Sequence, residues 1–143
     1  LIEGGHGISV QADCTVEQMK LADTDMVLLP GGLGGVHSIL ASETAMNFIR
    51  LAYEKNCLIA AICAAPTILA SLHITDGRRA TCYPGLEDQM DAAKMIPCGA
   101  VQDGNVITGR AAGSADEFGL ACLRALKGED TARQVASDIV YRV

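Results

Sequence analysis

Cys63 is the residue of this 143-residue chain that is best placed to do chemistry. It lies in the segment AAICAAP, residues 60–66, between one apolar run typical of a strand and a second typical of a helix. Small neighbours such as Ala64 allow a sharp strand-to-helix turn, of the kind that presents the nucleophile in serine hydrolases. Free N–H groups at such a turn stabilise a thiolate relative to a thiol. The pattern therefore predicts a reactive cysteine.

A buried, inert thiol is the alternative interpretation of any cysteine, and we expect it for Cys57, Cys98 and Cys122. The six cysteines contain no C-x-x-C pair and lie mostly in apolar runs, which favours free thiols in a reducing cytoplasm over disulfides. A metal site is not expected, because the histidines are far apart in the sequence and have no ligand-spaced cysteine beside them (His6, His37 and His73).

A glycine-rich stretch, GGLGG at residues 31–35, follows a predicted strand. It matches neither the G-x-G-x-x-G fingerprint nor the Gly-Lys-Ser/Thr ending of a P-loop, so nucleotide binding is not expected. Two interpretations remain: a tight turn that needs positive φ, or a set of bare N–H groups from Gly31 and Gly32 that could donate to an oxyanion.

Short apolar strands alternate with amphipathic helices along the chain, which predicts an α/β fold with a mainly parallel sheet. We expect Met26–Leu29 and Leu58–Ile62 to be adjacent central strands, covered on both faces. Further β structure is expected at residues 80–82 and as a hairpin across 101–108. Helices are expected after Ser42, at 64–72, at 87–94, from Ser114 to Lys127, and at 130–137.

Composition excludes several partner classes. The formal net charge is −6 and half of the residues are apolar, which is typical of one domain with a real core. The chain has no basic cluster beyond Arg78 and Arg79, so nucleic acid and anionic membranes are not expected as partners. The longest apolar run, residues 57–72, is interrupted by polar residues and Pro66 and is too short to span a bilayer.

Four motifs together resemble the ThiJ/PfpI superfamily: LLPGG at 28–32, AAICAAP at 60–66, ATCYPG at 80–85 and TGRAAGSADEF at 108–118. The most similar branch is that of the parkinsonism-associated protein, here called the DJ-one branch, and the similarity runs from about residue 8 to the end. The resemblance implies a flavodoxin-like three-layer sandwich, usually a homodimer, that works without a cofactor. It places the nucleophile of a cysteine elbow on Cys63 and backbone oxyanion donors on Gly32 and Ala64. Its pocket residue falls on Tyr83. Gly31 and Arg110 are further pocket candidates, and Arg110 lies on a loop after a strand, where it would face either the pocket or a dimer partner.

Two departures from this family pattern stand out. Tyr83 occupies a position that is often histidine in this branch, and tyrosine cannot act as a base at neutral pH. The family also holds a glutamate close to its cysteine, after the first strand, and Glu3 is not in the right context to replace it. We therefore expect residues 1–143 to form a single domain that lacks the N-terminal βαβ segment of the family.

The resemblance implies a cofactor-free glyoxalase or deglycase that acts on small reactive dicarbonyls such as methylglyoxal. The alternative is a non-catalytic redox sensor or chaperone in oxidative stress, because a reactive thiolate also reacts with peroxide. A PfpI-type cysteine peptidase or a glutamine amidotransferase is less expected, since both need a histidine partner. Ala64 occupies the position where the peptidase has that histidine, and no histidine follows His73.

Overall fold

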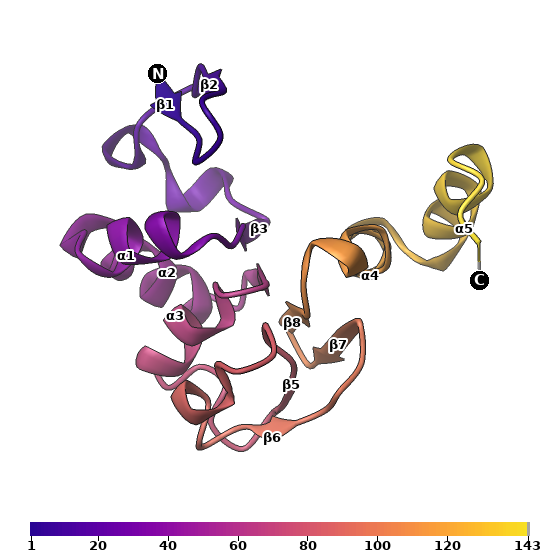
Figure 1. Ribbon diagram of the computed structural model, residues 1–143. Helices are drawn as coiled ribbons and strands as arrows, with labels where there is room; N and C mark the ends of the chain where they lie inside the picture. Colours follow the sequence, from indigo (N-terminus) through magenta and orange to yellow (C-terminus); the bar gives the residue numbers. More distant parts are fainter. Residues whose placement is uncertain (143) are drawn as a thin grey trace.

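A four-stranded sheet forms the centre of the computed structural model, which describes residues 1–142 (Figure 1). Its strands lie in the order β3 (Met26–Leu29), β4 (Leu58–Ile62), β8 (Val106–Gly109) and β7 (Ala100–Asp103). β3, β4 and β8 run parallel, and β7 pairs antiparallel with β8. The carboxyl ends of the three parallel strands therefore meet at one edge of the sheet.

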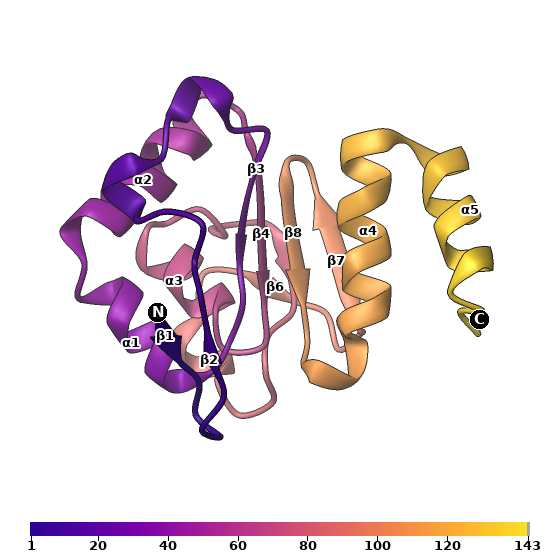
Figure 2. The ribbon, with the colours of Figure 1, turned by 90° about the horizontal axis from the view of Figure 1, so that it is seen from above.

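Helices cover both faces of this sheet (Figure 2). On one side lie α1 (Leu33–Leu40), α2 (Glu43–Glu54) and α3 (Pro66–Ser71), and on the other lies α4 (Ala115–Lys127). α5 (Glu129–Asp138) packs on α4, on the side away from the sheet. The predicted α/β sandwich of three layers with a mainly parallel sheet is confirmed.

Side chains that alternate along β4 divide the core in two. Ile59 and Ala61 pack in the cluster beneath α1, α2 and α3, whereas Ala60 packs with Ile107 and Phe118 beneath α4. This is the period of two that a strand covered on both faces requires. The prediction of a fully covered strand is therefore correct for β4.

β3 differs from its prediction. It pairs with β4 as expected, but it forms the edge of the sheet in the described residues rather than a central strand. Val27 and Leu29 are buried, whereas Leu28 is 47% exposed. The reason is that α4 packs mainly on β4, β7 and β8, which leaves the Leu28 face of β3 without a covering helix.

Local patterns predicted α2, α4, α5 and the β7–β8 hairpin correctly. The hydroxyl of Ser42 accepts a hydrogen bond from the Ala45 N–H at 3.2 Å, so it caps α2 as expected. The helix predicted at 64–72 is shorter and begins at Pro66. The sequence analysis did not predict α1. It also did not predict the N-terminal hairpin of β1 (Ile2–Glu3) and β2 (Ser9–Val10), or the short 3₁₀ turns η1 (Val16–Gln18) and η2 (Leu21–Asp23).

The segment after β4 and α3 also differs from expectation. The strand expected at 80–82 is β5 (Arg79–Ala80), and it pairs in parallel with β6 (Lys94–Met95). The helix expected at 87–94 is wrong: only the 3₁₀ turn η3 (Glu87–Gln89) forms there, and a second such turn, η4 (Ala112–Ser114), precedes α4. The physical reason is long-range pairing, because the Lys94 N–H donates to the Arg78 carbonyl at 2.7 Å and draws this segment away from a helical path.

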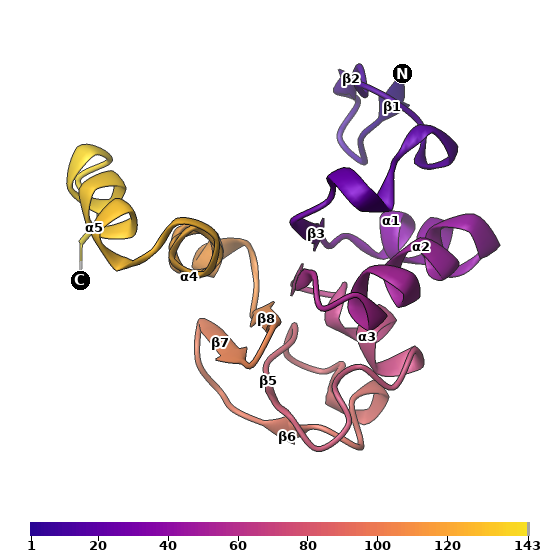
Figure 3. The same cartoon turned by 180° about the vertical axis from the view of Figure 1, so that it is seen from behind.

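The two small β units lie at opposite ends of the molecule (Figure 3). The N-terminal hairpin of β1 and β2 is on the β3 side of the sheet, and β5 and β6 lie on the side of β7 and β8, where β5 contacts β7. Across residues 1–142, no helix has both the length and the apolar character needed to cross a bilayer.

Candidate functional site

Cys63 directly follows β4 and has a positive φ of 66°. Its N–H donates to the Gly109 carbonyl at 2.9 Å, and its carbonyl accepts from the Tyr83 N–H at 2.8 Å. A left-handed conformation costs a non-glycine residue about 1–2 kcal/mol, so it persists only where the surroundings hold it. Two hydrogen bonds to segments distant in sequence hold it here, and the thiol is presented at the carboxyl edge of the sheet.

Gly31 lies directly against this turn. A Cβ atom built at position 31 would lie 2.6 Å from the Cβ of Cys63 and 2.9 Å from the Ile62 carbonyl oxygen. Both contacts are far closer than van der Waals distance. Gly31 is therefore required by the close approach of the loop after β3 to the turn after β4, rather than by turn flexibility.

Two backbone N–H groups beside Cys63 are free to donate. Gly32, with a φ of 88°, precedes α1, and Ala64 follows Cys63. Within residues 1–142, neither the Gly32 N–H nor the Ala64 N–H has a hydrogen-bond acceptor, whereas the Cys63 and Ala65 N–H groups are both paired. Both residues line one cavity with Cys63, and unpaired donors near a thiol are what an oxyanion formed at that thiol needs.

A cavity of about 340 Å³ opens over these groups. Its lining joins the loop after β3, the turn after β4 and the segment that follows β5 (Gly32, Leu33, Cys63, Ala64, Tyr83, Pro84, Gly85 and Leu86). Four of the residues singled out from the sequence line it: Gly32, Cys63, Ala64 and Tyr83. Gly31 lies beneath Cys63, and Arg110 is outside the lining.

Sequence reasoning did not select Leu86, which together with Leu33 forms the apolar part of the lining of this cavity. The signal that could have indicated Leu86 is the Pro84-Gly85 turn, because a turn at these residues brings the chain back beside Tyr83. Leu33 is the first residue of α1, a helix that the sequence analysis did not predict. The lining is thus mainly apolar, with backbone donors beside the thiol.

Cys82 is a second thiol close to this site. Burial, and then the carboxylate of Glu87, raise the pKa of Cys82 to about 11, and the charge of Cys63 adds to this increase. The Arg110 guanidinium acts in the opposite direction, which places its charge near Cys82. Among residues 1–142 no three His, Cys, Asp or Glu side chains converge in a group that could hold a metal ion.

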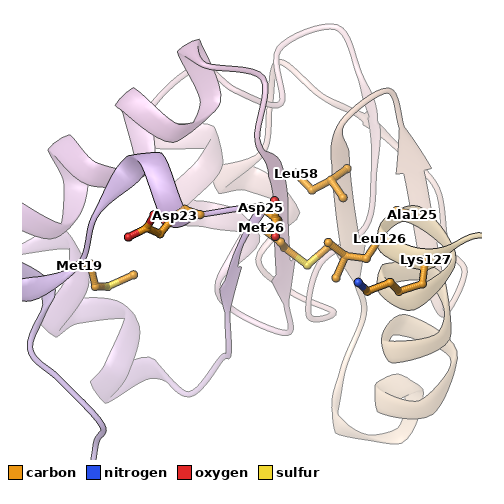
Figure 4. Close-up of a pocket in the computed structure, with 9 residues that line it drawn as sticks. Met19, Asp23, Asp25, Met26, Leu58, Ala125, Leu126 and Lys127 are labelled. Carbon is orange, nitrogen blue, oxygen red and sulfur yellow. The ribbon is translucent and has the colours of Figure 1, made fainter.

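A larger cavity, of about 680 Å³, lies at the other end of the sheet (Figure 4). It is lined by the residues that lead into β3, by Leu58 of β4 and by the last turn of α4. In Figure 4 the carboxylate of Asp23 points away from the ammonium group of Lys127, so these charges do not converge on one point. The lining of this cavity contains no cysteine, and it lies at the opposite ends of β3 and β4 from Cys63.

Comparison with known proteins identifies the family of the chain. Residues 1–125 match the DJ-1/PfpI family. The chain is 37% identical to the Parkinson disease protein 7 homolog of Danio rerio over 145 residues, which cover 99% of this chain and 77% of that protein. It is 33% identical to Deglycase PH1704 of Pyrococcus horikoshii over 111 residues, covering 76% of this chain and 66% of that protein.

The fold agrees with these relatives. The crystal structure of Drosophila melanogaster DJ-1beta superposes with a TM-score of 0.89 at 33% identity, covering 96% of this chain and 75% of that one. The family match includes the turn that carries Cys63, and the structural similarity extends over 96% of the chain. The chain belongs to the DJ-1/PfpI family.

Proposed function

We propose that the protein is a cysteine-dependent, cofactor-free enzyme of the glyoxalase or deglycase type, acting on small reactive dicarbonyls such as methylglyoxal. The observation that carries the proposal is the geometry at Cys63: a thiol on a positive-φ turn, with the unpaired N–H groups of Gly32 and Ala64 on the same small cavity. A family relative named as a deglycase supports the reaction class.

The first step follows from these groups. The Cys63 thiolate attacks the aldehyde carbon, a carbon–sulfur bond forms, and the carbonyl π electrons move to oxygen. The resulting oxyanion accepts hydrogen bonds from the Gly32 and Ala64 N–H groups, which were already unpaired and need no reorganisation. The apolar side chains of Leu33 and Leu86 in the lining suit the methyl group of methylglyoxal.

The second half of the reaction moves protons. In the hemithioacetal the proton on the sulfur-bearing carbon transfers to the neighbouring carbonyl carbon through an enediol, which yields a lactate thioester. Water then cleaves the thioester, so lactate leaves and the Cys63 thiolate is restored. We assign the proton transfer to the glutamate that the family resemblance implies, because the lining of the Cys63 cavity holds no carboxylate or imidazole.

A redox-sensing role is the second candidate, and the same lining favours it. Formation of a sulfenic acid needs a thiolate and a peroxide but no adjacent base. The peptidase and amidotransferase alternatives have no such support, because none of the three histidines lines the cavity.

Methylglyoxal turnover to lactate, measured with purified protein, tests the enzyme proposal. We expect Cys63→Ser to lower kcat/KM by more than about 10²-fold, because it removes the nucleophile. Cys57→Ser and Cys122→Ser serve as controls and should retain most of the activity. Equal loss in all three variants would indicate a folding defect, and absence of turnover in the wild-type protein would favour the redox sensor.

We also propose that the protein is a homodimer, on family resemblance. Light scattering at micromolar concentration is the test, and a monomer mass would contradict it.

A further inference from the structure

The main chain places Cys82 beside the Cys63 turn. The Tyr83 N–H donates to the Cys63 carbonyl at 2.8 Å, so residue 83 lies against residue 63, and Cys82 is its neighbour in the chain. Standard bond lengths then limit the separation of the Cys63 and Cys82 Cα atoms to less than about 8 Å. A disulfide spans Cα separations of about 4.4–6.8 Å.

The two thiols share an environment but differ in access. Cys82 packs with Ala80 and Met90, and Leu86 borders this cluster and also lines the Cys63 cavity. Cys82 is only 3% exposed, whereas Cys63 is half-buried and opens onto the cavity. A soluble oxidant therefore meets Cys63 first, and Cys82 meets mainly its protein neighbours.

We propose that Cys82 is the resolving cysteine of this site, which captures oxidised Cys63 in an intramolecular disulfide. The inference rests on the reactive Cys63 thiolate of the proposed function, but it requires no carbonyl substrate. Its role is protective and reversible: a disulfide can be reduced by thiols, whereas over-oxidation of Cys63 to the sulfinic acid cannot.

The chemistry balances with a peroxide as the oxidant. The Cys63 thiolate attacks one peroxide oxygen, the O–O bond breaks, and a sulfenic acid and hydroxide form. The Cys82 thiolate then attacks the Cys63 sulfur, an S–S bond forms, and the S–O bond breaks with loss of a second hydroxide. Protonation of both hydroxides gives water, so two thiols lose two electrons to one peroxide.

The environment of Cys82 determines the rate at which it attacks the oxidised Cys63 sulfur. Its pKa of about 11 keeps most of the thiol protonated at pH 7, so resolution is slow there. The rate of disulfide formation should rise about tenfold per pH unit up to about pH 10, in proportion to the fraction of Cys82 that is ionised. Oxidation of Cys63 also removes the thiolate charge that opposes ionisation of Cys82.

Peptide mapping tests the proposal directly. Trypsin separates the two thiols, because cleavage after Lys55, Arg78, Arg79 and Lys94 gives peptides 56–78 and 80–94. Peptide 56–78 also contains Cys57, so the experiment uses a Cys57→Ser background. The protein is treated with one equivalent of hydrogen peroxide at pH 7 and pH 9, alkylated with N-ethylmaleimide, and digested without reductant.

We expect a cross-linked pair of peptides 56–78 and 80–94, formed faster at pH 9. In a Cys82→Ala variant we expect no cross-link, capture of the Cys63 sulfenic acid by dimedone, and several-fold more sulfinic acid. Cys98→Ala is the control and should behave as the parent. If Cys63 is oxidised without a cross-link, and the parent protein and Cys82→Ala form equal amounts of sulfinic acid, the resolving role of Cys82 alone is overturned. An unmodified Cys63 would overturn both this inference and the nucleophile assignment.

Discussion

Gly31→Ala should damage both stability and the site, and the structure gives the size of the effect. The new Cβ would lie 2.6 Å from the Cβ of Cys63, about 1 Å inside a normal carbon–carbon contact. Two of the other close atoms, the Ile62 carbonyl oxygen and the Ala64 nitrogen, belong to the main chain and cannot rotate away. Overpacking of this kind costs about 1–3 kcal/mol. A shift of about 1 Å at the turn should also lower catalytic efficiency on the order of 10²-fold.

Gly119→Ala is the matched control. Gly119 is exposed in the middle of α4, and a Cβ there would contact nothing within 4 Å. Alanine is a better helix former than glycine by up to about 1 kcal/mol, so this variant should gain stability. Urea unfolding gives the free energy for both variants. A Gly31→Ala protein that unfolds within about 0.5 kcal/mol of wild type, with unchanged reactivity of Cys63, would refute the argument from close approach.

Three further predictions follow from the described contacts. Cys63→Gly should have a higher free energy of unfolding than Cys63→Ala, by about 0.5–1 kcal/mol, because glycine tolerates the φ of 66°. The opposite order of unfolding temperatures in calorimetry would contradict strain at this turn. Thr75→Val should raise the free energy of unfolding by about 1 kcal/mol in urea titrations, since the buried Thr75 hydroxyl has no partner among the described residues; a loss would argue against this. Burial raises the pKa of Cys82 and Cys122 to about 11, so the folded state retains protons that the unfolded chain releases from about pH 9. The free energy of unfolding should therefore fall as the pH rises from 9 to 11, by up to about 3 kcal/mol per thiol. In urea titrations over this pH range, Cys122→Ala should lose less stability than the wild-type protein.

Local sequence patterns predicted the elements that local forces determine. β4 and α2 follow from an apolar run and a serine cap, and α4 from its charged first turn and the glycine after its end. α1 was not predicted because Gly34 and Gly35 in its first turn are poor helix formers, and it forms by packing on α2 and α3. The failed helix at 87–94 has the same origin, since pairing of β5 with β6 overrides local preference.

The candidate site was predictable only in part. Cys63 and the glycines before α1 could be found, because small residues at the end of a strand are a local signal. The position of Cys82 next to Cys63 could not, since it depends on one main-chain hydrogen bond between residues 20 apart. The exposure of Leu28 depends on where α4 lies on the sheet, and no pattern within β3 encodes that.

The conformation of Cys63 depends on segments that are made at different times during synthesis. Gly31 packs beneath the turn, Tyr83 and Gly109 hold it by hydrogen bonds, and these residues span 79 positions of the chain. Until residue 109 has been synthesised and β8 has paired with β4, Cys63 cannot be held in its left-handed turn. A nascent or partly unfolded chain should therefore lack the reactivity that we propose for Cys63 in the native protein. On that proposal, labelling of Cys63 should report that the long-range pairing of the sheet is complete, and should follow the last stage of folding.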